Sequence, residues 1–201
     1  MLEAGRLDVS QGPTAAGLTL CALSRYGERQ AFSGHGGVLT YAQALALVAQ
    51  YQVVFTKAGL ERGQRIALLT ANRADAWLAS VAASALGLCT NSLHPLGSLA
   101  DHLFALDNGR ADDLIVDAHA YPTCGGELHA QADGLRQVFT VGPAQYGIDL
   151  QAQAASVGAA SARVLVQPGD LAMLGYTGGT TGKSKGAMRR HPCAVASNGL
   201  A

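Results

Sequence analysis

Short β-rich runs alternate with helical patterns along most of this chain, which limits the folds open to it. Strands are predicted at residues 66–70, 88–92, 113–117, 137–141 and 170–177, the last as the final strand running into a loop. Helices are predicted over residues 40–58, 72–86, 98–108 and within 118–136. Alternation of this kind is typical of parallel βαβ units. It predicts an α/β fold with a mostly parallel sheet flanked by helices.

Two of the predicted helices begin at capping signals. Thr40 is followed three residues later by Gln43, and Ser98 by Asp101. In such a pair the hydroxyl accepts from a backbone N–H, and the longer side chain accepts from the backbone of the cap. Glycine, which favours helix ends, follows both helices. Residues 142–167 are weakly patterned and are predicted to form a surface connection.

Composition excludes several classes of protein. The chain of 201 residues is 49% hydrophobic, and 14 Lys and Arg balance 14 Asp and Glu. Because nucleic-acid binders usually carry a basic face, no nucleic-acid partner is expected. The longest uncharged apolar stretch, residues 76–89, is shorter than the ~20 residues of a membrane span. No transmembrane segment is therefore expected, and the length predicts about one domain.

The cysteines and histidines give no sign of a disulfide framework or a metal site. The four cysteines are scattered without a C-x-x-C pair. Reduced thiols in a cytoplasmic protein are therefore expected. His119, Cys124 and His129 are each separated by four residues, a spacing that matches no common zinc pattern.

Residues 176–186, YTGGTTGKSKG, form the most unusual passage in the chain. They contain four glycines, three threonines and two lysines, and no acidic residue. Glycine lets the backbone turn with positive φ and lets a ligand approach the N–H groups closely. Successive N–H groups make an anion-binding nest, to which hydroxyls and a lysine charge add further donors. The passage therefore favours phosphate binding over a plain glycine-rich turn.

A P-loop is a weaker interpretation of the same residues. That motif reads G-x-x-x-x-G-K-[ST], and Gly182, Lys183 and Ser184 match its end. However, Thr177 stands where the first glycine is required. A P-loop also opens a nucleotide domain, whereas only 15 residues follow Gly186.

The passage resembles the signature loop of the adenylate-forming, AMP-binding superfamily, which reads approximately Y-T-S-G-T-T-G-x-P-K-G. Eight positions match: Tyr176, Thr177, Gly179, Thr180, Thr181, Gly182, Lys185 and Gly186. Gly178 replaces the usual serine, which removes one hydroxyl donor. Ser184 replaces the usual proline, which removes a fixed φ. Neither change adds charge or bulk.

Weaker similarities follow in the family's order along the chain. Residues 39–41 are similar to its L-[TS]-Y motif, and residues 63–69 to its G-D-R-V-A-[IL]-L strand. Residues 85–95 resemble its A-x-G-A…P-L-x-P stretch. Residues 186–191 are similar to its G-V-x-x-[ST]-H. The resemblance covers about residues 39–191 and is nearest to acyl-CoA synthetases of the fatty-acid–CoA ligase type.

The resemblance implies ATP-dependent activation of a carboxylic acid. An acyl-adenylate forms, and a thiol, commonly coenzyme A, then displaces AMP. The residues implied in holding the ATP phosphates, together with Mg²⁺, are Thr177, Gly178, Gly179, Thr180, Thr181, Gly182 and Lys185. Lys185 is implied as the catalytic lysine, and Lys183 is interpreted as a solvated flank. His191 is implied near the acyl group, with a packing role as its alternative.

The family's adenine-binding segment, its G-Y-G-x-T-E motif, its ribose-binding Asp and the lysine of its C-terminal domain all follow the signature loop. None is found in residues 1–201. The chain is therefore interpreted as a single incomplete N-terminal AMP-binding domain, inactive by itself, of an acid–thiol ligase. A phosphate-binding module without ligase activity and an unrelated small α/β protein are the alternatives.

Overall fold

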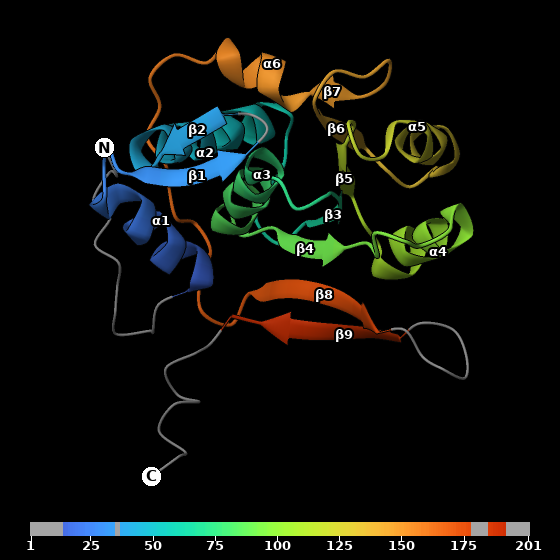
Figure 1. The fold of residues 1–201 in the computed structure, drawn as a ribbon. Coiled ribbons are helices and arrows are strands. Elements are labelled where there is room, and N and C mark those ends of the chain that lie inside the picture. Colours follow the sequence, from blue (N-terminus) through green and yellow to red (C-terminus); the bar gives the residue numbers. More distant parts are fainter. Residues whose placement is uncertain (1–13, 35–36, 178–184, 192–201) are drawn as a thin grey trace.

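The computed structural model describes residues 14–34, 37–177 and 185–191 (Figure 1). The helices are α1 Ala15–Arg25, α2 Tyr41–Lys57, α3 Ala74–Ala85, α4 Leu99–Gly109, α5 Pro122–Gln131 and α6 Leu150–Ala155. The strands are β1 Gln30–Gly34, β2 Gly37–Thr40, β3 Arg65–Leu69, β4 Cys89–Ser92, β5 Asp113–Asp117, β6 Gln137–Val141, β7 Ile148–Asp149, β8 Leu171–Thr177 and β9 Lys185–Arg190.

Seven of these strands form one sheet in the order β7-β6-β5-β3-β4-β8-β9. Every neighbouring pair is parallel except β8 and β9, which are antiparallel. Strands β1 and β2 form a separate antiparallel hairpin. The predicted α/β fold with a mostly parallel sheet is confirmed.

Helices cover both faces of the sheet. One core joins α1, α2, α3 and α6 to one face, and a second core joins α4 and α5 to the other (Figure 1). Within β3, Ile66 and Leu68 belong to the first core, whereas Ala67 and Leu69 belong to the second. Successive strand side chains point to opposite faces, so a strand buried on both sides must be apolar at every position.

The predicted capping boxes are both present. The Thr40 hydroxyl accepts from Gln43 N–H at 3.2 Å, and Gln43 Oε1 accepts from Thr40 N–H at 2.8 Å. Ser98 and Asp101 make the equivalent pair at the start of α4. These local contacts set the entry points of α2 and α4.

Three features of the fold differ from the expectations. Residues 142–167 are more than a surface connection, because they include β7 and α6, and Leu150, Ala154, Ala162 and Val166 are buried in the core. Strand β8 is not the final strand, since β9 follows it. Gly109 is the last residue of α4 rather than the residue after it, and the C-cap residue Arg110 takes the left-handed conformation at φ 48°.

The chain changes direction across the sheet beside β3. From β3 it passes through α3 on one face to β4, and from β4 through α4 on the opposite face to β5. Where the connections after neighbouring strands run over opposite faces of the sheet, a crevice forms outside the carboxyl ends of those strands. In α/β proteins ligands bind in this crevice. This edge of the sheet is therefore the place to look for a site.

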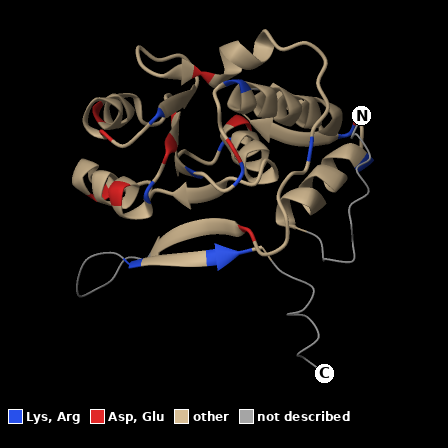
Figure 2. Ribbon diagram, turned by 180° about the vertical axis from the view of Figure 1, so that it is seen from behind, with Lys and Arg blue, Asp and Glu red and all other residues tan. Residues whose placement is uncertain are grey.

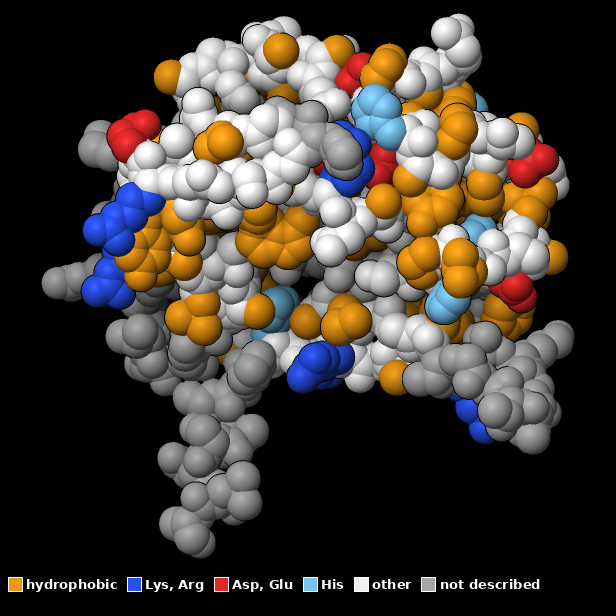
Figure 3. Space-filling view, viewed as in Figure 1, with side chains coloured by type: hydrophobic (Ala, Val, Ile, Leu, Met, Phe, Trp, Pro, Cys, Tyr) orange, Lys and Arg blue, Asp and Glu red, His pale blue; other side chains and the backbone are white. Residues whose placement is uncertain are grey.

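The surface is mixed in character. Acidic and basic residues are spread along the ribbon, and β9 carries basic residues at both of its ends (Figure 2). Hydrophobic side chains lie between them over much of the face in Figure 3. Among the described residues, no helix has the length and apolar character needed to cross a membrane.

Candidate functional site

The candidate site begins where β8 ends. Because β8 runs parallel to β4, its carboxyl end lies at the same edge of the sheet as the crevice. Thr177, the last residue of β8, is the cross-strand partner of Lys185, the first residue of β9. Directly opposite residues of an antiparallel pair lie about 5 Å apart at Cβ. Both ends of the unusual glycine-rich passage are thus held together at this edge (Figure 1).

Most of the predicted phosphate-binding residues lie outside the described residues. These are Gly178, Gly179, Thr180, Thr181 and Gly182. Of the predicted set, the backbone of Thr177 and the exposed residue Lys185 are described. The structure brings these two together, and the assignment of phosphate binding stays a prediction.

Tyr176 connects the end of β8 to α4. Its hydroxyl donates to Asn108 Oδ1 at 2.8 Å and lies 3.4 Å from the carbonyl oxygen of Ala105. Its ring meets Phe104 edge-on, with centroids 6.5 Å apart. The side chain therefore joins the residue before Thr177 to the last turns of a helix on the second face of the sheet.

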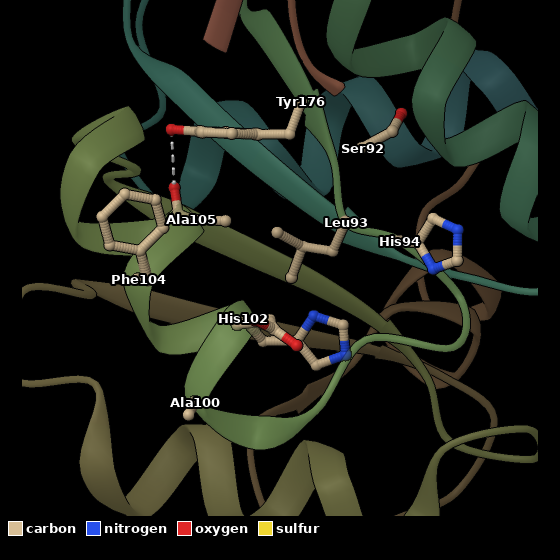
Figure 4. A pocket seen from close by; sticks show the side chains of 9 residues that line it. Ser92, Leu93, His94, Ala100, His102, Phe104, Ala105 and Tyr176 are labelled. Atoms are coloured by element: carbon tan, nitrogen blue, oxygen red, sulfur yellow. Dashed lines mark hydrogen bonds between the residues drawn. The ribbon is translucent and has the colours of Figure 1, made fainter. Parts of the chain in front are cut away.

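A pocket of about 280 Å³ adjoins this tyrosine (Figure 4). Its apolar walls come from Leu93, Ala100, Phe104 and Ala105, and its polar lining includes Ser92, His94, Asp101 and His102. Figure 4 places Tyr176 on one side of the pocket and the imidazoles of His94 and His102 on other sides. Among the residues that the structure describes, none of those lining the pocket is Lys or Arg, so this part of the lining suits a neutral group better than a phosphate.

The electrostatics of the pocket follow from burial and capping. Burial lowers the pKa of His102, which is only 2% exposed, so that its neutral form is favoured. Asp101 accepts from the hydroxyl and N–H of Ser98, and these contacts lower the pKa of its carboxyl group. The pocket thus combines the buried imidazole of His102, whose neutral form is favoured, with the Asp101 carboxylate, which is already engaged by Ser98.

His191 lies at the opposite end of β9 from Lys185. Six residue steps at ~3.3 Å separate the two positions by about 20 Å. His191 is buried, its backbone N–H donates to Asp170 O at 2.9 Å, and Nε2 has no hydrogen-bond partner among the described residues. Burial lowers the pKa of its imidazole. The structure therefore does not bring His191 near the two ends of the signature loop.

Sequence reasoning missed Asn91, Asn108 and Gly109 as neighbours of the site. The amide Nδ2 of Asn91 donates to Ala105 O at 3.2 Å, and a Cβ on Gly109 would lie 2.7 Å from that Nδ2. These residues are 67 to 85 positions before Tyr176, and no local pattern marks them. Only the packing of α4 against β4 and β8 brings them together.

The described residues contain no group of three or more His, Cys, Asp or Glu side chains able to hold a metal ion. Mg²⁺ is commonly carried by substrate phosphates with only one or two protein carboxylates. A magnesium ion that arrives on a nucleotide would therefore not need such a cluster.

Comparison with known proteins identifies the family. A profile described as AMP-binding enzyme matches residues 21–201, nearly the whole chain. The chain belongs to the AMP-binding enzyme family. Membership explains why the glycine-rich passage and the α/β fold occur together.

Individual relatives of this AMP-binding chain are ligases and synthetases. The medium/long-chain-fatty-acid–CoA ligase FadD8 of Mycobacterium tuberculosis is 33% identical over 189 residues, 90% of this chain and 33% of the relative. The 3-hydroxybenzoate–CoA ligase of Aromatoleum sp. is 26% identical over 171 residues, 84% of this chain and 32% of the relative. The chain spans about a third of the length of these curated relatives.

Solved structures of the family share the fold. The amide bond synthetase McbA from Marinactinospora thermotolerans superposes with a TM-score of 0.75 at 26% identity. The match covers 89% of this chain and 34% of McbA. This agreement confirms that the chain adopts part of the adenylate-forming fold.

Proposed function

We propose that this chain holds the phosphates of ATP in an enzyme that activates carboxylic acids, as the N-terminal part of that enzyme. One observation carries the proposal: the signature passage of an AMP-binding family has both its ends, Thr177 and Lys185, in one cross-strand pair at the carboxyl edge of the sheet. Backbone N–H groups and hydroxyls beyond Thr177 would then surround an anion. Lys185 would supply a point charge.

The reaction sets a problem of charge, because a carboxylate must approach a polyanion. The carboxylate oxygen attacks the α-phosphorus of ATP, the acyl-adenylate forms, and pyrophosphate leaves. Thr177, residues 178–182 and Lys185 would hold the phosphates and stabilise the charge that builds on the departing pyrophosphate. Mg²⁺ bound to the nucleotide would supply further positive charge.

In a second step a thiol attacks the acyl carbonyl, and AMP leaves. We propose coenzyme A as the thiol and a fatty acid as the acid, because the FadD8 relative is a fatty-acid–CoA ligase. Two other outcomes compete in an assay. One is activation of an aryl acid, as the name of the 3-hydroxybenzoate ligase implies, and the other is formation of an amide, as the name of McbA implies. The cytoplasm, which supplies ATP and CoA, is the proposed location.

Lys185 is the residue proposed to act in the first step. His191 lies about 20 Å along β9 from Lys185, so it is kept apart from the phosphate-binding residues. We propose it as a contact of the acyl group. The described lining residues of the 280 Å³ pocket include no Lys or Arg, which supports placing phosphate binding at the strand ends rather than in that pocket.

Calorimetric titration of the 201-residue chain tests the site. Magnesium pyrophosphate and Mg·ATP are expected to bind competitively, and AMP much more weakly, because the proposed contacts are to the β- and γ-phosphates. Lys185→Ala should weaken pyrophosphate binding about tenfold or more, the value of one charge-assisted contact. Arg189→Ala, which removes an exposed cation farther along β9, is the matched control.

Acid-dependent exchange between ATP and pyrophosphate tests the reaction. The intact enzyme should catalyse exchange with fatty acids and form acyl-CoA, whereas the 201-residue chain should not. Exchange by the chain itself would contradict the prediction of inactivity. If the intact protein binds pyrophosphate but catalyses no exchange with any acid, the result would instead favour a phosphate-binding module.

A further inference from the structure

Strand β8 loses one of its two neighbours before it ends. Its pairing with β4 runs through Met173, Leu174 and Gly175. Tyr176 and Thr177 pair with β9 alone in the described sheet, and all six residues of β9 are exposed. The end of β8 therefore needs support from side chains on the side where β4 has stopped.

Tyr176 provides a contact on that side. Its hydroxyl donates to Asn108 Oδ1 at 2.8 Å, with Ala105 O at 3.4 Å, and its ring packs edge-on against Phe104. Figure 4 shows the hydroxyl directed at Ala105 of α4, away from the imidazoles of the pocket. The backbone position next to Thr177 is thus joined to the last turns of α4.

The helix end that receives this hydroxyl is itself held by the sheet. Asn91 of β4 donates to Ala105 O at 3.2 Å, and Arg65 of β3 donates to Gly109 O at 2.8 Å. Gly109 permits the close approach, because a Cβ there would lie 3.3 Å from the Tyr176 hydroxyl. Strands β3, β4 and β8 therefore each contribute a hydrogen bond to the same helical turn, which these bonds hold against the sheet.

We propose that Tyr176 is a positioning residue for phosphate binding, acting through its hydrogen bond to Asn108. The inference rests on the proposed function, since it assigns Thr177 and Lys185 to the phosphates. Asn108 is exposed, so water can replace the lost partner and global stability should change little. Phosphate affinity depends on where the strand ends lie and should fall.

The test combines binding with amide exchange in the 201-residue chain. Tyr176→Phe keeps the ring and removes the hydroxyl, and Asn108→Leu removes the acceptor. Each is expected to weaken magnesium pyrophosphate binding about fivefold, the value of one hydrogen bond. The double variant should be no weaker than either single variant, because both remove one contact. Tyr26→Phe, which removes a hydroxyl from an exposed tyrosine, is the matched control.

Amide exchange measured by NMR distinguishes local positioning from general destabilisation. In Tyr176→Phe, exchange at Tyr176 and Thr177 should quicken about fivefold, while exchange at Met173 and Leu174 and the melting temperature stay as in wild type. Unchanged exchange at the strand end, or unchanged affinity, would overturn the inference. A wild-type chain that binds no pyrophosphate would overturn the proposed function, and the exchange rates would still decide whether the hydroxyl holds the strand.

Discussion

Replacement of Gly109 by alanine tests the close packing of α4 against the sheet. Gly109 is buried as the last residue of α4, where its peptide lies beside β4 and β8. An added Cβ would lie 2.7 Å from Asn91 Nδ2, 3.1 Å from Leu174 Cδ2 and 3.3 Å from the Tyr176 hydroxyl. The first of these distances is shorter than real Cβ contacts allow, so a buried neighbour must move.

Two opposing effects set the size of the change. Alanine improves helix propensity by up to ~1 kcal/mol over glycine. Overpacking of a buried site costs ~1–3 kcal/mol, and displacement of the Asn91 amide removes a buried hydrogen bond of ~1 kcal/mol. The net expectation for Gly109→Ala is a loss of ~1–3 kcal/mol in the free energy of unfolding. For a chain of this size, each kcal/mol lowers the melting temperature by about 2–4 °C.

Gly126 in α5 is the matched control. A Cβ there would lie 3.6 Å from the Tyr146 ring, which is ordinary van der Waals contact. Gly126→Ala should therefore stabilise the chain by ~0.5–1 kcal/mol through helix propensity alone. Urea and thermal unfolding followed by circular dichroism give both values. If Gly109→Ala stabilises the protein as Gly126→Ala does, the packing of α4 on β4 and β8 is refuted.

For three further changes the structure decides whether the free energy of unfolding rises or falls. Arg110→Gly should stabilise by ~0.5–1 kcal/mol in urea unfolding, because Arg110 holds a left-handed conformation that glycine adopts without strain; a destabilised variant would contradict this. Tyr51→Phe should raise the free energy of unfolding by ~1 kcal/mol, since the buried hydroxyl has no hydrogen-bond partner in the described part of the chain; a loss would reveal a contact there. Burial lowers the pKa of His102 and His191 in the folded chain. As the pH falls, the unfolded chain therefore binds protons at these histidines at a higher pH than the folded chain does. The free energy of unfolding, measured by urea titration, should be highest above the ordinary value of 6.5 and fall from pH 7.5 to 5.5; replacing both by Gln should flatten this slope.

Local signals explain which elements the sequence predicted well. The capping boxes at Thr40 and Ser98 act between residues three apart, so the chain carries the whole contact within one turn. Strands β5 and β6 were predicted with the bounds they have, because central strands covered on both faces read as continuous apolar runs. The glycine-rich passage was recognised from its donors and its lack of acids. The membership of the chain in the AMP-binding enzyme family, which this passage suggested, is confirmed.

Other elements have no such local signal. Helix α1 and the β1–β2 hairpin were not predicted, and β9 was missed because its exposed residues show no apolar alternation. The segment after residue 142 is held by distant partners. Gln52 donates to Arg163 O and accepts from Arg163 N–H, both at 2.8 Å, so an α2 side chain serves as the backbone partner of a segment 111 residues away.

The sequence by itself determined the family, the α/β class and the segment expected to bind phosphate, because these depend on residue types at short spacing. Only the tertiary structure decided how the ends of that segment are supported. Asn91, Asn108 and Tyr176 lie on three elements, and they meet because Gly109 lets α4 approach β4 and β8. Hydrogen bonds between residues so far apart exist only after the sheet has formed, and no periodicity of the chain encodes them.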